Sequence, residues 1–181
     1  MLAGAVHGSS MNARQSQLSF ATAPGLACFR VTGKPSLDLS GHLRQAAEKL
    51  IAAGHSLLLV DLADCPSVDS TFVGVLIFLT KAVQKATPPG RVCLMQAGDL
   101  VRHQLDSLGV LDRFDLAERK SGELRFADVS LTPASKAQNT WLCLTAHRDL
   151  IEAHAANAAK FKDVVEFLEA DLRRQAPPDA G

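Results

Sequence analysis

The residues of this chain that most suggest chemistry are a short polar run, Asp69-Ser70-Thr71, directly before the most apolar stretch of the sequence. The side chain of Asp69 or Ser70 is a preferred N-cap, because its oxygen accepts a hydrogen bond from an unpaired backbone N–H at a helix start. On the residues alone, capping explains part of this polar run, and a further role of the triplet stays open.

The apolar stretch after the triplet, residues 72–83, predicts a helix that is apolar around nearly its whole circumference. Helical spacing sorts its side chains into two stripes: Val73, Leu76, Ile77 and Thr80, and Phe72, Val75, Leu79 and Val83. Such a helix is either buried on all sides or offers one side to another molecule. The stretch is therefore either a core helix or a candidate docking surface beside the polar triplet.

Other reactive residues do not form a recognisable catalytic or ligand site. Gly33-Lys34-Pro35-Ser36 departs from a phosphate-binding loop, because a proline separates the lysine from the serine. Ser70 lacks the G-x-S-x-G turn of a hydrolase nucleophile, and no motif places a histidine beside it. The 4 cysteines are widely separated, without a C-x-x-C pair or clustered histidines. We therefore expect no enzyme, no cofactor and no metal site.

The segments that position the triplet alternate between strand and helix. Apolar runs predict strands near 27–32, 56–61 and 91–95, and helical spacing predicts helices near 39–53, 70–85 and 99–108. The continuous apolar run at 56–61 is typical of a strand buried on both faces. This alternation predicts an α/β fold with helices packed on a mostly parallel or mixed sheet.

Composition indicates a globular protein without a global charge. Of the 181 residues, 47% are hydrophobic and 21% charged, and 19 basic side chains balance 19 acidic ones. This balance argues against nucleic acid or an anionic membrane as a partner. The longest apolar run is too short to span a bilayer. Residues 1–17 lack the apolar core of a secretory signal, so we expect a flexible tail and a cytoplasmic protein.

The C-terminal part has a different character. Residues 119–140 are rich in Ser, Gly, Pro and charge, which predicts a linker or long loop, and residues 141–181 predict a helical extension. An apolar ridge of this extension consists of Phe161, Val164, Val165, Leu168 and Leu172. Because exposing such a ridge is costly, we expect it to pack on the main domain, residues 18–118, or on its copy in a homodimer. In either case we expect the face around Ser70 to stay open.

Four segments, in order and at suitable spacing, resemble the STAS domain of bacterial anti-sigma factor antagonists. They are Val31-Thr32-Gly33, Leu58-Leu59-Val60-Asp61-Leu62, Val68-Asp69-Ser70-Thr71-Phe72-Val73-Gly74-Val75-Leu76 and Val101-Arg102-His103-Gln104-Leu105-Asp106-Ser107-Leu108-Gly109-Val110. The resemblance runs from about Cys28 to Leu116. It implies a STAS-like α/β domain, with a sheet of four or five strands, to which the C-terminal helical extension is added.

The resemblance also implies a function. The protein would be a regulatory protein-binding module, an anti-sigma factor antagonist in a partner-switching pathway, and its partner an anti-sigma factor that acts as a serine kinase. Ser70 would be the phosphoacceptor, and the partner-binding residues would be Asp69, Thr71, Phe72, Val75, Leu79 and Asp38. A phosphate on Ser70 would repel an apolar or acidic partner surface without unfolding the domain. The alternative is a STAS module that is not phosphorylated and serves as a scaffold or as an accessory subunit in small-ligand or lipid transport.

Overall fold

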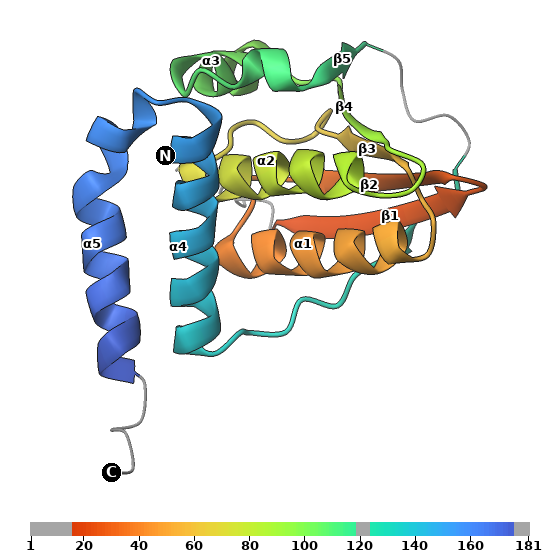
Figure 1. The fold of residues 1–181 in the computed structure, drawn as a ribbon. Helices are drawn as coiled ribbons and strands as arrows, with labels where there is room; N and C mark the ends of the chain where they lie inside the picture. Colours follow the sequence, from red (N-terminus) through yellow and green to blue (C-terminus); the bar gives the residue numbers. More distant parts are fainter. Residues whose placement is uncertain (1–15, 119–123, 176–181) are drawn as a thin grey trace, which may run out of the picture.

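A single sheet holds the six strands found within residues 16–118 and 124–175, the part of the chain that the computed structural model describes (Figure 1). The strand order is β5-β4-β3-β2-β1-β6. Its parallel part consists of β2 (Leu26–Thr32), β3 (Leu57–Asp61), β4 (Arg91–Met95) and β5 (Asp115–Ala117). On the other side of β2, the strands β1 (Gln17–Ala23) and β6 (Ala127–Asp128) are added antiparallel. The sheet is thus mixed, with β2 and β3 at its centre.

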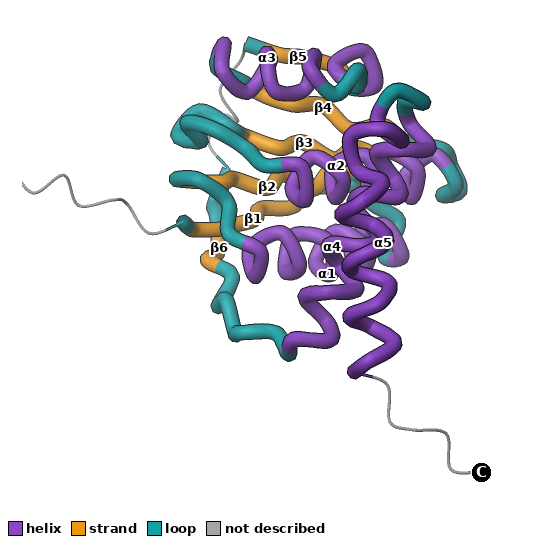
Figure 2. Tube along the Cα trace, turned by 90° about the vertical axis from the view of Figure 1, so that its left-hand side faces the viewer, coloured by secondary structure: helices purple, strands orange, loops and turns teal. Residues whose placement is uncertain are grey.

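Five helices lie within the described residues, and the first two of them form a layer on the sheet. They are α1 (Leu37–Ala52), α2 (Ser70–Gln84), α3 (Asp99–Ser107), α4 (Lys136–Ala153) and α5 (Asn157–Gln175), with a 3-10 turn at Leu111–Arg113. Figures 1 and 2 show α1 and α2 side by side over one face of the sheet, α4 running across them, and α5 on the outer side of α4. Within the described ranges, no helix combines the length and apolar character that crossing a bilayer requires.

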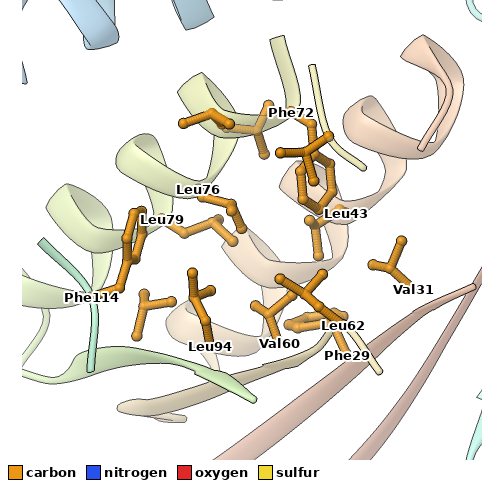
Figure 3. Close-up of a cluster of buried hydrophobic side chains, with 14 of the residues drawn as sticks. Phe29, Val31, Leu43, Val60, Leu62, Phe72, Leu76, Leu79, Leu94 and Phe114 are labelled. Atoms are coloured by element: carbon orange, nitrogen blue, oxygen red, sulfur yellow. The ribbon is translucent and has the colours of Figure 1, made fainter. Parts of the chain in front are cut away.

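The hydrophobic core lies between the sheet and the two helices α1 and α2 (Figure 3). Side chains alternate between the two faces of a strand, so Phe29 and Val31 of β2 point toward the helices together with Val60 of β3. Leu43 of α1 and Phe72 of α2 meet them from the helix layer.

The predicted α/β layering and the strand at 56–61 are therefore confirmed. Burial on both faces of this strand is met only in part, because Leu58 and Val60 are buried whereas Leu57 and Leu59 are half-buried.

Three strands of the sheet, β1, β5 and β6, were not predicted from the sequence patterns. Gln17–Ala23, at the junction of the predicted tail and domain, forms β1 and pairs along its whole length with β2. Ala127–Asp128 forms β6 inside the segment predicted as a linker, 119–140. The same segment contains the start of α4, where Ser135 and Gln138 form a reciprocal capping box. The helical extension therefore begins before residue 141.

The extension packs on the main domain through α4, whereas the predicted ridge belongs to α5 and packs mainly on α4. α4 lies on α2, and α5 packs on α4 through the half-buried side chains of Phe161, Val165, Leu168 and Leu172. Val164, assigned to the same ridge, is 39% exposed, and Phe167 is 63% exposed. Pairing of α5 with a second copy of the chain stays a prediction.

Candidate functional site

Of the two residues predicted as possible caps of α2, Asp69 caps the helix and Ser70 does not. Asp69 is the N-cap of α2, since its Oδ1 accepts a hydrogen bond of 2.9 Å from the N–H of Phe72. Its carbonyl oxygen accepts the first helical hydrogen bond from the N–H of Val73 at 3.0 Å. Because Asp69 performs the capping, the hydroxyl of Ser70, the first residue of α2, is available for another contact.

The hydroxyl of Ser70 makes that contact with α4. Ser70 Oγ lies 3.0 Å from Nε2 of His147, and Nδ1 of His147 lies 2.7 Å from the carbonyl oxygen of Cys143. A carbonyl oxygen only accepts, so in the neutral ring Nδ1 carries the proton and Nε2 accepts the Ser70 hydroxyl proton. The imidazole is 6% exposed and packs edge-on against Phe161, with ring centroids 4.8 Å apart. The Ser70 hydroxyl is thus held by an oriented, buried histidine.

Close to this hydrogen bond, the backbones of α2 and α4 touch. A Cβ atom added to Gly74 would lie 2.3 Å from the carbonyl oxygen of Ala146. The hydroxyl of Thr71 points to Cys143, with 3.8 Å between Oγ1 and Sγ. Only a residue without a side chain permits this approach, so Gly74 is what lets α4 lie directly on α2.

An ion cluster holds the later part of both helices together. The ammonium of Lys81 on α2 donates to Asp149 at 2.7 Å and to Glu152 at 2.6 Å, both on α4. The hydrogen bond and charge of Lys81 lower the pKa of the Glu152 carboxyl from its ordinary value. The α2–α4 contact therefore has a polar end at Ser70, a backbone contact at Gly74 and an ion cluster at Lys81.

The predicted partner surface on α2 requires a correction. Phe72, Val75 and Leu79 each have 0% exposure and belong to the hydrophobic core, so a partner cannot reach them in this structure. The expectation that the extension leaves the Ser70 face open is also wrong, because α4 covers it. α2 is apolar all round for a simple reason: the sheet and α1 bury one side, and α4 buries the other.

The other predicted partner-binding residues lie in different surroundings. Thr71 is buried, whereas Asp69 is exposed at the end of the loop that precedes α2. Asp38 is in the first turn of α1, and its Oδ1 accepts a 3.2 Å hydrogen bond from the N–H of Ala134, shortly before α4. Asp38 therefore holds the segment that leads into α4. Ser70 and Asp69 alone among the predicted residues combine proximity to the α2 start with at least partial exposure.

The loop before α2 is held to its neighbours by hydrogen bonds of its backbone groups. The N–H of Gly33, which has a positive φ of 75°, donates to the carbonyl oxygen of Asp64 at 2.9 Å. The N–H of Val68 donates to Oε1 of Gln104 on α3 at 2.9 Å. Three of the sequence segments that carry the family resemblance therefore meet around the start of α2.

The described residues can also be compared with the requirements of metal binding and of thiol reactivity. Within residues 16–118 and 124–175, no group of three His, Cys, Asp or Glu side chains is placed to hold a metal ion. Burial raises the pKa values of the Cys28 and Cys65 thiols to about 11, which keeps them protonated and unreactive near neutral pH. Cys143, beside the Ser70 contact, also has a raised pKa because of burial.

A separate hollow of about 740 Å³ lies between α1 and the extension, within the size range of small-molecule sites. Its walls include Glu48, Asn139, Trp141 and Leu172. The guanidinium of Arg44 lies 4.7 Å from the centroid of the Trp141 ring and 3.6 Å from the centroid of the Phe78 ring. The hollow is thus a second feature that the extension adds to the domain.

Comparison with known proteins places the fold. No protein-family model matches the chain, and no curated protein matches it either. Among solved structures, the chain is similar to an anti-sigma factor antagonist from Mycobacterium paratuberculosis, with 18% identity over 58% of this chain and 87% of that one and a TM-score of 0.50. It is equally similar to the anti-sigma factor antagonist SpoIIAA in its unphosphorylated form, with 17% identity, coverage of 58% and 90%, and a TM-score of 0.50. The predicted STAS-like fold is therefore confirmed.

Proposed function

We propose that this chain is a cytoplasmic anti-sigma factor antagonist, a non-enzymatic module that binds an anti-sigma factor and is controlled by phosphorylation of Ser70. The observation that carries the proposal is the place of Ser70 at the first residue of α2, in a fold shared with two anti-sigma factor antagonists. Ser70 is half-buried, and its hydroxyl does not cap the helix. A phosphate there would gain from the helix dipole and would add charge beside the carboxylate of Asp69.

The partner would bind the exposed loop at the start of α2 rather than the buried stripe of the helix. Asp64, Pro66 and Asp69 are exposed on this loop, and Lys34 is exposed in the turn that is hydrogen-bonded to it. Phosphorylation of Ser70 would weaken the complex, because a doubly charged group at such a contact must be desolvated and lies next to another negative charge.

Phosphosite mapping tests the proposal. The full chain is incubated with magnesium, ATP and a purified anti-sigma factor kinase, and modified residues are located by mass spectrometry. We expect one phosphate on Ser70, none on the Ser70→Ala chain, and full modification of the Ser67→Ala control, whose serine precedes α2 by three residues. Phosphate at other residues only, or equal labelling of the Ser70→Ala chain, would contradict the assignment.

A second candidate function is favoured by the Ser70–His147 hydrogen bond and by the hollow beside Trp141. A hydroxyl that is already bound inside the protein is a poor kinase substrate, and a hollow of this size suits a small ligand. The second candidate is therefore a STAS module that is not phosphorylated and acts as a scaffold or as an accessory subunit in small-ligand or lipid transport. It predicts an unmodified Ser70 and an intrinsic Trp141 fluorescence that responds to the ligand.

A further inference from the structure

Helix α4 holds the Ser70 hydroxyl, which a partner bound to the exposed loop before α2 would have to reach. We propose that α4 is an internal competitor of the anti-sigma factor for unmodified Ser70, and that His147 is the residue through which α4 senses whether Ser70 is modified. This inference rests on the proposed function in one respect, the identity of the external competitor. The internal contact itself can be tested without any partner.

The contact between α4 and Ser70 fits only a serine whose hydroxyl is unmodified. Ser70 Oγ and His147 Nε2 are 3.0 Å apart, which is the length of one hydrogen bond and leaves no room for a phosphorus atom and its oxygens. The imidazole is fixed by its second hydrogen bond, to the Cys143 carbonyl, and by Phe161. It therefore cannot turn aside without a movement of α4.

A larger group on Ser70 would act as a wedge between the two helices. Ser70 and Gly74 are four residues apart and so lie on the same face of α2. The backbone of Gly74 contacts the backbone of Ala146 on α4. Ala146 directly precedes His147 and follows Cys143 by three residues. Because this contact tolerates no added volume even at Gly74, volume added one turn earlier must lift α4 away from Ser70.

The charge of the added group acts in the same direction as its size. His147 is the titratable side chain that α4 presents to Ser70, and Asp69 is the charged neighbour on the loop. The His147 ring is buried and packs edge-on against Phe161, so a charged group placed in this contact would lose its hydration. Asp69 adds repulsion. We therefore infer that a negative group on Ser70 releases α4 rather than clamping it.

The chain contains a built-in reporter of α4. It has 1 tryptophan, and this residue, Trp141, is on α4 with its ring stacked on Arg44 of α1. The indole is 48% exposed. Lifting α4 breaks the stack, so Trp141 fluorescence shifts to longer wavelength while the sheet stays folded.

The experiment uses the full chain and measures hydrogen exchange together with Trp141 fluorescence. Ser70→Glu adds bulk and charge, and Ser70→Gln adds the same bulk without charge. Ser67→Glu places the same charge in the loop, three residues before α2. We expect amides of α4 to exchange at least tenfold faster in Ser70→Glu, less so in Ser70→Gln, and as in wild type in Ser67→Glu. Amides of β3 and β4 should stay protected throughout. Exchange of α4 that is unchanged or slower in Ser70→Glu would overturn the inference.

A second variant decides the matter if Ser70→Glu also exposes the sheet. His147→Ala removes the sensing side chain without placing a charge at α2, and α4 should then exchange at least threefold faster with β3 still protected. Unchanged exchange of α4 in His147→Ala would show that His147 does not hold the helix. These results are independent of the phosphosite mapping, so a chain that no kinase modifies refutes the proposed function and leaves the α4 inference to be judged by exchange alone.

Discussion

Replacement of Gly74 by alanine is the change whose sign depends most directly on the packing of α4 against α2. In the interior of a helix that touches nothing, alanine is about 1 kcal/mol more favourable than glycine. Here the new Cβ would lie 2.3 Å from the carbonyl oxygen and 2.7 Å from the Cα of Ala146. These are backbone atoms, which cannot rotate away as a side-chain tip can. We therefore place the penalty at the upper end of the range of about 1–3 kcal/mol that overpacking usually causes.

The two contributions together predict a net loss of about 1–2 kcal/mol for Gly74→Ala, or a fall in Tm of roughly 2–8 °C for a chain of this size. Gly41→Ala is the matched control, because its Cβ would meet only Cδ2 of Leu142 at 3.4 Å. That variant should be neutral or more stable by up to about 1 kcal/mol. Urea unfolding followed by circular dichroism and Trp141 fluorescence measures both. A Gly74→Ala chain as stable as the Gly41→Ala chain would refute the backbone contact.

Three further changes test the surroundings of the site. Lys81→Met should lower stability by less than about 1 kcal/mol. Lys81 lowers the pKa of Glu152 from its ordinary 4.5. The ion pair therefore stabilises the fold above pH 4.5, and this contribution disappears as the pH falls through the lowered pKa. Lys81→Met, which lacks the pair, should lose less stability in acid than wild type does. His147→Ala should reduce the free energy of unfolding by about 1–3 kcal/mol, through a lost hydrogen bond and a cavity, and equal urea midpoints would contradict this. Iodoacetamide at pH 8 should leave Cys28 and Cys65 unmodified until urea is added, since their pKa values are about 11.

Periodicity was sufficient to predict the elements that form the core. The run of leucines ending at Val60 identified β3, because central strands of a parallel sheet read as nearly continuous apolar runs. Asp69 was one of two predicted caps, and the structure assigns the role to it. β1 was missed because Gln17–Ala23 mixes Gln, Ser and Thr with its apolar residues. Its strand character depends on pairing with β2, a tertiary effect that local patterns do not contain.

The cover on α2 could not be predicted from local patterns. Ser70 and His147 are 77 residues apart, and no motif links them. Two local signals did point to α4: the capping residues Ser135 and Gln138, and the presence of Gly74 in a helix otherwise built from bulky side chains. A glycine in a helix interior is unfavourable unless a close approach requires it, and here Ala146 provides the reason. The partner of such a glycine becomes visible only in three dimensions.

The most direct test of the account is a calorimetric titration of an anti-sigma factor, captured from the native cell with the full chain and then purified, into three forms of the protein. Ser70→Ala should bind at least as tightly as wild type, because it places no charge at the start of α2 and removes the hydroxyl that α4 holds. Ser70→Asp should bind at least tenfold more weakly, a difference of about 1.4 kcal/mol. Equal affinities for Ser70→Ala and Ser70→Asp, with both chains folded, would show that Ser70 is not the regulated residue and would contradict the account.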